Sequence, residues 1–307
     1  MTEKVFEVII IGGGPAGLTA GLYTSRAGLK SLLLEKGVFG GQITNAEHVE
    51  NFPGFPQGIS GIELGDRMRE QAEKYNLKIE SDEATGIEIQ AEKKIIKTPD
   101  VTYTTSALIL AGGSIRKKLG VPGEDTYLGK GISYCATCDS AFFRDMPVVV
   151  VGGGDAALTE ALHLAKHAST VTVIHRRHEL RATRILQERA FAETKIRFLW
   201  STTIAAIEGS NMVKRVRLTN IQTGKISQLE TAGVFISVGF EPATELVRGI
   251  LSLDEIGHII TNEKMETSVP GVFAAGDIRH NSARQAITAA GDGATAAINA
   301  QKYLTEG

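Results

Sequence analysis

The chain holds two cysteines among 307 residues, in Tyr134-Cys135-Ala136-Thr137-Cys138-Asp139. Two intervening residues suit a disulfide that opens and closes easily, and Asp139 is placed to move the proton that thiolate chemistry requires. The same spacing also occurs in half of a zinc site and in packed thiols. Zinc needs about four ligands, and no second cysteine pair exists to supply them. We therefore expect a redox dithiol and no metal, although Asp139 could instead simply start a helix.

A glycine-rich sequence precedes this motif, Gly12-Gly13-Gly14-Pro15-Ala16-Gly17. It follows a β-branched run at 5–11 that predicts a buried strand, and it precedes a helical stretch at 18–27 and a second strand at 31–34. Glu35 ends that strand, at the position of an acid that holds a ribose hydroxyl. Such glycines let the backbone approach a pyrophosphate at a helix N-terminus, so we expect a first dinucleotide site. Its candidate residues are Gly12, Gly14, Pro15, Ala16, Gly17 and Glu35.

The pattern restarts 140 residues later (152 − 12 = 140), with Gly152-Gly153-Gly154-Asp155-Ala156-Ala157 between a strand at 147–151 and a helix at about 157–167. The second strand, 171–174, is followed by His175 where the first unit has Glu35. Arg176 and Arg177 come next, and Arg181 lies one helical turn further on. An acid would repel a 2′-phosphate, whereas arginines bind it bidentately. The second unit therefore predicts NADP binding, with a solvated basic helix start as the alternative.

The remaining segments frame these motifs. A long loop rich in Gly, Pro and Asn covers 37–58, and an amphipathic helix is expected at 62–75. Gly271 to Asp277 predicts strand, turn and acid, and Asp277 could bind a cofactor hydroxyl or cap a helix. A helix at 283–304 is rich in Ala and Gly, so we expect another element to pack closely against it. Strands are expected at 77–80, 84–91, 93–98, 101–104, 107–110 and 233–238.

Composition narrows the class of protein. The length suggests about two domains, and a hydrophobic fraction of 42% suffices for their cores. A formal net charge of −2 gives no electrostatic case for nucleic acid or a membrane surface. So few cysteines fit a reducing compartment. The apolar run at 8–11 is too short for a signal peptide, and no run approaches a membrane span. We expect a soluble cytoplasmic protein.

Together these motifs resemble one family over nearly the whole chain, the low-molecular-weight thioredoxin reductases, which are flavoprotein disulfide reductases. The cysteine motif between two nucleotide motifs is the most specific part. The others are the two glycine sequences, Gly40-Gly41-Gln42, Glu50 to Gly54, His175 to Arg177 with Arg181-Ala182, Thr267 to Asp277, and Arg284-Gln285-Ala286.

The resemblance implies an α/β fold of two Rossmann-like, three-layer β/β/α nucleotide-binding domains. The NADPH domain, 115–243, would carry the redox cysteines and be inserted in an FAD domain made of 1–114 and 244–307. Electrons would pass from NADPH through FAD and the Cys135–Cys138 disulfide to a thioredoxin-like protein. Cys138 would face the flavin, Cys135 would attack the partner disulfide, and Asp139 would act as the local acid-base. The resemblance also implies a homodimer with a rotating NADPH domain and a role in cell redox homeostasis.

It implies particular cofactor contacts as well. FAD would be bound by the first glycine sequence with Glu35, Gly41, Gln42, Asn51, Ala84, Gly276, Asp277, Arg284, Gln285 and Ala286. NADPH would be bound by Gly154, Asp155, Ala156, Glu160, His175, Arg176, Arg177, Arg181 and Gly239.

Some positions depart from the family pattern. Ser140 stands where the family usually has a glycine. Gly112 lies where the usual motif is Ala-Thr-Gly, and Thr159 replaces the first of a usual pair of glutamates. Ser140 adjoins the redox motif and could tune rate or partner choice. The alternatives are an NADPH-dependent flavoprotein that reduces another disulfide or a peroxidase partner, and a flavin-binding redox sensor without turnover. Phe142-Phe143 could be a docking patch or ordinary core.

Overall fold

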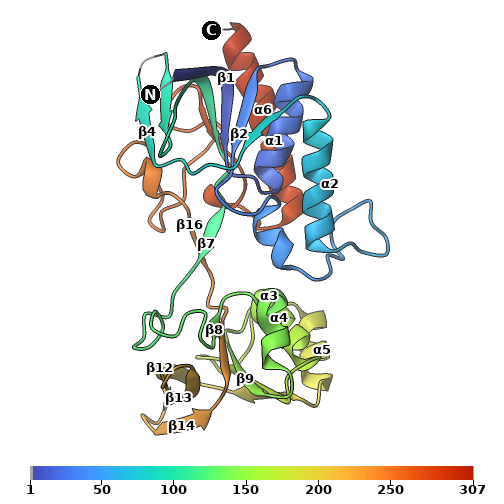
Figure 1. Cartoon of the computed structure of the whole chain (residues 1–307), viewed down its shortest axis with the longest axis vertical. Helices are drawn as coiled ribbons and strands as arrows, with labels where there is room; N and C mark the ends of the chain where they lie inside the picture. Colours follow the sequence, from blue (N-terminus) through green and yellow to red (C-terminus); the bar gives the residue numbers. More distant parts are fainter. Residues whose placement is uncertain (1–2, 91, 307) are drawn as a thin grey trace. The chain divides into compact units, whose positions relative to one another are not determined.

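The computed structural model describes residues 3–90 and 92–306. The chain forms two compact units: one contains residues up to Ile115 and from Glu241 onward, and the other contains Arg116–Phe240. The second unit is thus a continuous insertion in the first. Two segments connect the units, β7 (Ser114–Arg116) and β16 (Phe240–Pro242), and they pair with each other as a small sheet (Figure 1).

The first unit is built on a mainly parallel sheet. Its core order is β3-β2-β1-β6, with β17 and the β5-β4 hairpin both paired to β6. The predicted strands 101–104 and 107–110 form one strand, because the first half of β6 pairs with β5 and the second half with β17. Residue 91 of the predicted strand 84–91 lies outside the described residues. The bounds are β1 (Glu3–Ile11), β2 (Ser31–Leu34), β3 (Lys78–Glu80), β4 (Gly86–Ile89), β5 (Lys94–Lys97), β6 (Thr102–Leu110) and β17 (Val272–Ala274).

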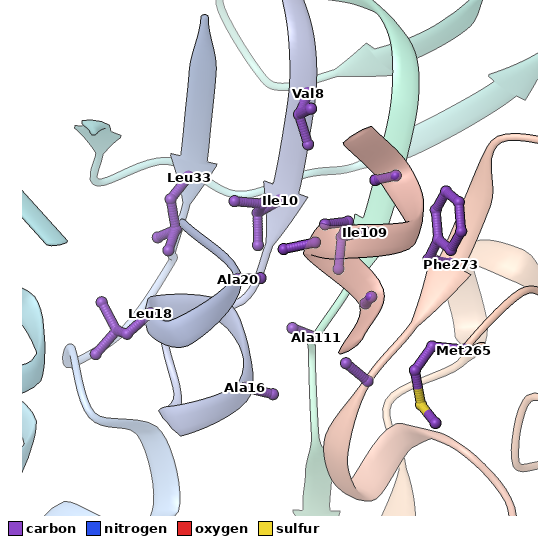
Figure 2. Close-up of a cluster of buried hydrophobic side chains, with 14 of the residues drawn as sticks. Val8, Ile10, Ala16, Leu18, Ala20, Leu33, Ile109, Ala111, Met265 and Phe273 are labelled. Carbon is purple, nitrogen blue, oxygen red and sulfur yellow. The ribbon is translucent and has the colours of Figure 1, made fainter. Parts of the chain in front are cut away.

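Helices cover one face of this sheet (Figure 1): α1 (Pro15–Arg26), α2 (Gly61–Glu73) and α6 (Ala286–Glu306). Figure 2 shows buried residues of one cluster in the shared core: Val8, Ile10, Leu33, Ile109 and Phe273 of the strands, and Ala16 and Ala20 of α1. A Cβ on Gly293 of α6 would overlap the Ala16 carbonyl of α1, so the two helices approach closely. The close packing expected from the Ala and Gly content is confirmed.

The predicted start of α6 at residue 283 is wrong by three residues. Arg284 has φ +56°, in the left-handed region, so the helix cannot begin before it. The segment 37–58 contains a short 3₁₀ helix, η1 (Gly41–Asn45), and a bridge between Val49 and Ile59. A second 3₁₀ turn, η4 (Gly276–Ile278), follows β17.

The second unit has three layers. Its parallel sheet has the order β11-β10-β9-β15-β8, with an antiparallel β12-β13-β14 sheet on one face and helices on the other (Figure 1). Val148 and Val150 of β9 pack toward the helices, whereas Val149 and Val151 pack toward the antiparallel sheet. The bounds are β8 (Ile132–Ser133), β9 (Pro147–Val151), β10 (Thr170–Ile174), β11 (Ile196–Leu199), β12 (Thr202–Gly209), β13 (Val213–Asn220), β14 (Ile226–Glu230), β15 (Gly233–Ile236), α4 (Asp155–Ala165) and α5 (Arg184–Ala192).

The central strands β9 and β15 carry no polar side chain, as expected for a parallel sheet that is covered on both faces. The predicted α/β class with parallel sheets is confirmed. Within the described part of the chain, no helix combines the length and apolar character that a membrane crossing requires.

Candidate redox and nucleotide sites

Cys135 and Cys138 form a disulfide in the second unit. Cys138 lies within the short helix α3 (Ala136–Asp139), and Cys135 is its N-cap. The Cys138 N–H donates to Cys135 Sγ at 3.2 Å, and the Cys135 N–H donates to Ser133 Oγ at 2.9 Å. Cys138 is exposed and Cys135 half-buried. The packed-thiol alternative is wrong because the sulfurs are bonded, and residues 3–90 and 92–306 contain no cluster of His, Cys, Asp and Glu suited to a metal.

The residues after Cys138 bear on two alternatives that the sequence left open: whether Asp139 caps a helix, and whether Phe142-Phe143 is core or surface. Asp139 ends α3 and precedes the 3₁₀ helix η2 (Ser140–Phe143), without a side-chain capping bond. Phe143 is buried, with its ring edge-on to Phe235 at 5.3 Å between centroids. Phe142 is 76% exposed, so the pair is divided between core and surface.

Partly buried hydrogen bonds hold the segments on both sides of the disulfide. On the N-terminal side, Tyr134 Oη donates to Glu124 Oε1 at 2.6 Å, and the same carboxylate accepts the N–H groups of Leu119 and Gly120 at 2.9 and 2.7 Å. Burial and the Glu124 carboxylate raise the pKa of Tyr134. On the C-terminal side, Ser140 Oγ lies 3.0 Å from Nε2 of His163 on α4. Sequence reasoning missed Glu124 and His163, which lie in no motif.

The first glycine sequence forms a tight turn from β1 into α1. Gly12 has φ +110°, and a Cβ there would overlap the Ala111 carbonyl. A Cβ on Gly17 would overlap the carbonyl of Gly12. Gly14 is the N-cap of α1 and Pro15 is its first residue, where a missing N–H costs nothing. The turn therefore presents bare backbone at the start of a helix, as a pyrophosphate requires.

Glu35 lies against this turn. Its Oε2 accepts the Gly13 N–H and its Oε1 accepts the Gly37 N–H, both at 2.6 Å. The Gly40 N–H donates to the Gly13 carbonyl at 2.8 Å, which brings the start of the 37–58 segment against the glycine sequence. The acid that is predicted to bind a ribose is thus held next to the glycine turn of the predicted first site.

Several other predicted FAD residues converge within the first unit. Asn51 Nδ2 donates to Gln285 Oε1 at 2.9 Å, across 234 positions of sequence. Gln42 Oε1 accepts a bond from Asn45 Nδ2 at 3.1 Å, and a Cβ on Gly41 would lie 3.1 Å from the Gly14 Cα. Gly276 faces Ala16 of α1. Arg284 contacts His258, and Ala286 is the first residue of α6.

Asp277 and Ala84, which are also predicted FAD residues, have other partners than that group. Asp277 lies in η4 and accepts a bond from Ser282 Oγ at 3.1 Å, nine residues before α6, so it does not cap that helix. Burial raises the pKa of Asp277. Ala84 is buried in the core on the other face of the sheet, two residues beyond Asp82, whose N–H donates to the Glu35 carbonyl.

A buried ion pair that the sequence did not reveal fixes the η4 turn. Asp292 of α6 accepts bonds from Arg279 Nε and Nη2 at 2.7 and 2.8 Å and from the Gly276 N–H at 3.1 Å. Such bidentate pairs fix orientation as well as position. The pair therefore ties the predicted flavin-site segment 276–279 to α6.

The second glycine sequence repeats the turn with a different polar residue beneath it. Gly152 has φ +150°, and a Cβ on Gly153 would collide with the His175 imidazole. His175 is 5% exposed, and among the described residues its Nε2 has no hydrogen-bond partner. Burial lowers the pKa of His175, helped by the neighbouring arginines.

Basic side chains surround that turn. Arg176, Arg177 and Arg181 are exposed, and within 3–90 and 92–306 they form no ion pair. The Arg181 N–H donates to the Gly153 carbonyl at 2.7 Å. Asp155 Oδ1 accepts the Thr183 N–H at 2.6 Å, and Asp155 and its neighbour Ala156 are exposed at the start of α4. The turn thus combines free backbone groups with unneutralised guanidinium groups.

Glu160 is instead engaged in a buried network. Arg116 Nη1 donates to Glu160 Oε1 at 2.7 Å, and Ser237 Oγ donates to Glu160 Oε2 at 2.8 Å. Burial raises the pKa of Glu160, and the Arg116 guanidinium opposes that rise. Gly239, also predicted as a cofactor residue, has φ +110° and accepts the Lys117 N–H at 2.9 Å.

Comparison with known proteins agrees with this geometry. The family described as pyridine nucleotide-disulphide oxidoreductase matches residues 6–293. The chain belongs to this family. It is 47% identical to a thioredoxin reductase of Mycolicibacterium smegmatis over 99% of this chain and 98% of that relative, and 47% identical to that of Bacillus subtilis over 99% and 96%. A crystal structure of Lactococcus lactis thioredoxin reductase superposes with a TM-score of 0.95, at 44% identity over 98% of this chain and 99% of that chain.

Within this pyridine nucleotide-disulphide oxidoreductase, two of the three departures have simple surroundings. Thr159 is exposed on α4, so the buried acid of the usual glutamate pair, Glu160, is kept. A Cβ on Gly112 would make ordinary contacts with Ile278 and Ala243. Ser140 differs from both because its hydroxyl is buried and bonded.

Proposed function

We propose that this pyridine nucleotide-disulphide oxidoreductase reduces the disulfide of a thioredoxin-like protein, using NADPH, FAD and the Cys135–Cys138 disulfide. The observation that carries the proposal is the disulfide itself, which includes the exposed residue Cys138 and lies in the same unit as a basic nucleotide turn. The thioredoxin reductases that are 47% identical over nearly their whole length support the choice of substrate.

The first glycine sequence fits FAD. The turn at Gly12 and Gly17 leaves no room for side chains, and Glu35 presents a carboxylate beside it. These residues would hold the pyrophosphate and the ribose, while the segments around Gln42, Asn51, Asp277 and Gln285 would line the remainder. When bound, FAD supplies the hydride chemistry that no side chain can perform.

The second glycine sequence fits NADPH. Gly154, Asp155 and Ala156 begin α4, where an anionic diphosphate is stabilised. Arg176, Arg177 and Arg181 would bind the 2′-phosphate, and a neutral His175 would pack beneath the turn without adding charge. The part of the chain from 116 to 240 would thus be the NADPH domain and the remainder the FAD domain.

The cysteines divide the disulfide chemistry. In the dithiol, the Cys138 N–H would stabilise a Cys135 thiolate, because charge-assisted bonds to sulfur favour the ionised form. Cys135 attacks the partner disulfide, one partner sulfur leaves as a thiol, and a mixed disulfide forms. Cys138 then attacks Cys135, which closes the internal disulfide and releases the second partner thiol. Asp139 would accept and return the proton of the Cys138 thiol.

Exposure alone would favour the opposite roles, because Cys138 is the more exposed residue. A trapping experiment distinguishes them. Cys138→Ser should retain a mixed disulfide with thioredoxin through Cys135, whereas Cys135→Ser should not. Accumulation of the complex only with Cys135→Ser would reverse the assignment.

Phe142 gives the partner an apolar contact next to the disulfide. It is 76% exposed, and exposed aromatic side chains are common anchors in protein interfaces. Phe142→Ala should therefore raise KM for thioredoxin while leaving the reduction of a small disulfide unchanged. The homodimer and the cytoplasmic location stay predictions, which sedimentation and cell fractionation would test.

The direct test is NADPH consumption by the FAD-loaded protein with the thioredoxin of its own organism. The proposal predicts turnover with thioredoxin far above that with small disulfides or a peroxidase partner. Preference for one of those substrates would favour the alternative flavoprotein. Oxidation of a single equivalent of NADPH, without turnover on any disulfide, would indicate a redox sensor.

A further inference from the structure

Ser140 is the one departure from the family pattern that has a buried hydrogen-bonded side chain next to the redox motif. It is 4% exposed, two residues beyond Cys138, and its Oγ lies 3.0 Å from Nε2 of His163. His163 lies on α4, against which α3 packs. The bond therefore joins the C-terminal end of the redox turn to a long helix of the unit. A glycine at 140 would remove that connection.

The other end of the turn is held by a similar bond. Tyr134, directly before Cys135, donates to Glu124, which is 3% exposed and also accepts two backbone N–H groups. Residues 135–139 therefore lie between two side-chain hydrogen bonds, one at Tyr134 and one at Ser140. The Ser140–His163 bond thus completes the fixation of a turn whose N-terminal end is already tied.

We propose that Ser140 and His163 are a positioning pair that favours closure of the Cys135–Cys138 disulfide over the open dithiol. The inference rests on the proposed function and concerns its internal step. On closure, Cys135 and Cys138 each lose a proton and together give two electrons to an external disulfide, which leaves as two thiols. That equilibrium depends on the effective concentration of one sulfur at the other, which falls when one end of the turn is free to move.

The test measures this equilibrium directly. The FAD-loaded protein is equilibrated with mixtures of reduced and oxidised dithiothreitol, quenched with acid, labelled with a maleimide and weighed by mass spectrometry. Ser140→Ala and His163→Phe should each shift the equilibrium toward the dithiol by about two- to tenfold, the effect of one net hydrogen bond. A tenfold change corresponds to about 30 mV in the midpoint potential.

Matched variants separate positioning from general damage. Ser140→Thr keeps the hydroxyl and His163→Gln keeps a hydrogen-bonding side chain, so both should lie near the wild type. Thr159→Ala, on the exposed side of α4, should also match it. The double variant should shift the equilibrium by less than the sum of the two single shifts, because both variants remove the Ser140–His163 bond.

Unchanged equilibria in Ser140→Ala and His163→Phe would overturn the proposal, and so would additive shifts in the double variant. If Ser140→Ala does not fold, Ser140→Gly, which has the residue usual in the family, takes its place. FAD content and the melting temperature check the fold of each variant. The assay contains neither NADPH nor thioredoxin, so an unchanged equilibrium would not contradict the proposed substrate. Conversely, if the protein does not reduce thioredoxin, this equilibrium can still be measured.

Discussion

The two nucleotide-binding units share the backbone conformation of the glycine turn. They differ in the side chains at two equivalent positions. Glu35 and His175 both follow the second strand, at an offset of 175 − 35 = 140 residues, and both contact the second glycine of their turn. On the helix after the turn, Ala20 of the first unit corresponds to Glu160 of the second (160 − 140 = 20), and both are buried. The same backbone turn is thus used in both units, and single side chains next to it determine the local charge of each site.

That difference bears on the choice of ligand. A carboxylate at position 35 suits free ribose hydroxyls, whereas a neutral imidazole flanked by arginines suits an added phosphate. The same comparison shows that the second unit holds a buried acid where the first holds an alanine, so it needs Arg116 as a counter-charge.

The largest effect is expected at the arginines. Each charge-assisted bond to a phosphate contributes about 1.5–3 kcal/mol, so removal of two should cost about 3–6 kcal/mol before non-additivity. Arg176→Ala with Arg177→Ala should lower kcat/KM for NADPH by roughly two to four decades and barely change that for NADH. The control is Arg184→Ala, whose exposed ion pair with Glu188 lies outside the group. Equal use of both cofactors by the wild type would contradict the comparison.

The next largest effect is expected at Arg116. Arg116→Met should leave the buried Glu160 carboxylate without its guanidinium partner and lower the stability of the second unit by about 3 kcal/mol. Urea unfolding measures the loss. Arg217→Met, whose side chain is exposed, serves as the control and should change little.

This loss should depend on pH. Burial already raises the folded-state pKa of Glu160, and removal of Arg116 raises it further. A raised carboxyl pKa destabilises the folded state as pH rises through that pKa and spares it at lower pH, where the group is protonated. The deficit of Arg116→Met should therefore be larger at pH 8 than at pH 5. A deficit that grows toward pH 5 would show that another group dominates.

Glu35 should have a smaller effect, confined to the first site. Glu35→Gln removes the charge that accepts the Gly13 and Gly37 N–H groups and would bind ribose. The affinity for FAD should fall by about 1.5–3 kcal/mol, or roughly 10- to 150-fold, measured by fluorescence on titration of the apoprotein. Glu83→Gln, an exposed residue paired with Lys36, is the control. Unchanged FAD affinity would remove Glu35 from the site.

The smallest effect tests the α1–α6 contact, which the second unit lacks because the C-terminal helix belongs to the first. Gly293→Ala would place a methyl group on the Ala16 carbonyl and should destabilise the first unit by about 1–3 kcal/mol. Gly291→Ala on the same helix meets no atom and should be neutral or stabilising by up to about 1 kcal/mol. Equal melting temperatures for the two variants would contradict the close approach.

The sequence predicted the repeated parts of this structure well because each signal is local. The glycine turns, their flanking strands and the cysteine turn each depend on neighbours within about thirty residues. The exact start of α6 was missed because Arg284 adopts a backbone conformation that its residue type rarely takes. The three-layer arrangement came from the family resemblance rather than from the individual strands 202–230, which alternate weakly.

The remaining site features depend on contacts between distant segments. Glu124 and His163 have ordinary positions in the sequence, and only the fold brings them to Tyr134 and Ser140. Lys94 is similar: its type predicts exposure, yet it is fully buried, with Nζ bonded to the Ser106 carbonyl and over the Tyr303 ring. Such partners have no periodicity or spacing from which they could be predicted.

The insertion of one unit in the other also sets an order of events on the ribosome. Residues 116–240 form a continuous unit, whereas the contact between Ala16 and Gly293 joins positions 293 − 16 = 277 residues apart. At about 5–20 residues per second, roughly 14 to 55 s pass between the synthesis of Ala16 in α1 and that of Gly293 in its partner helix. Consider a nascent chain that is stalled after residue 280, with residues 116–240 already outside the exit tunnel. Residues 116–240 should resist protease, while α1 should still be cleaved. The apolar face of α1 thus lacks its α6 contact until the last part of the chain has been made.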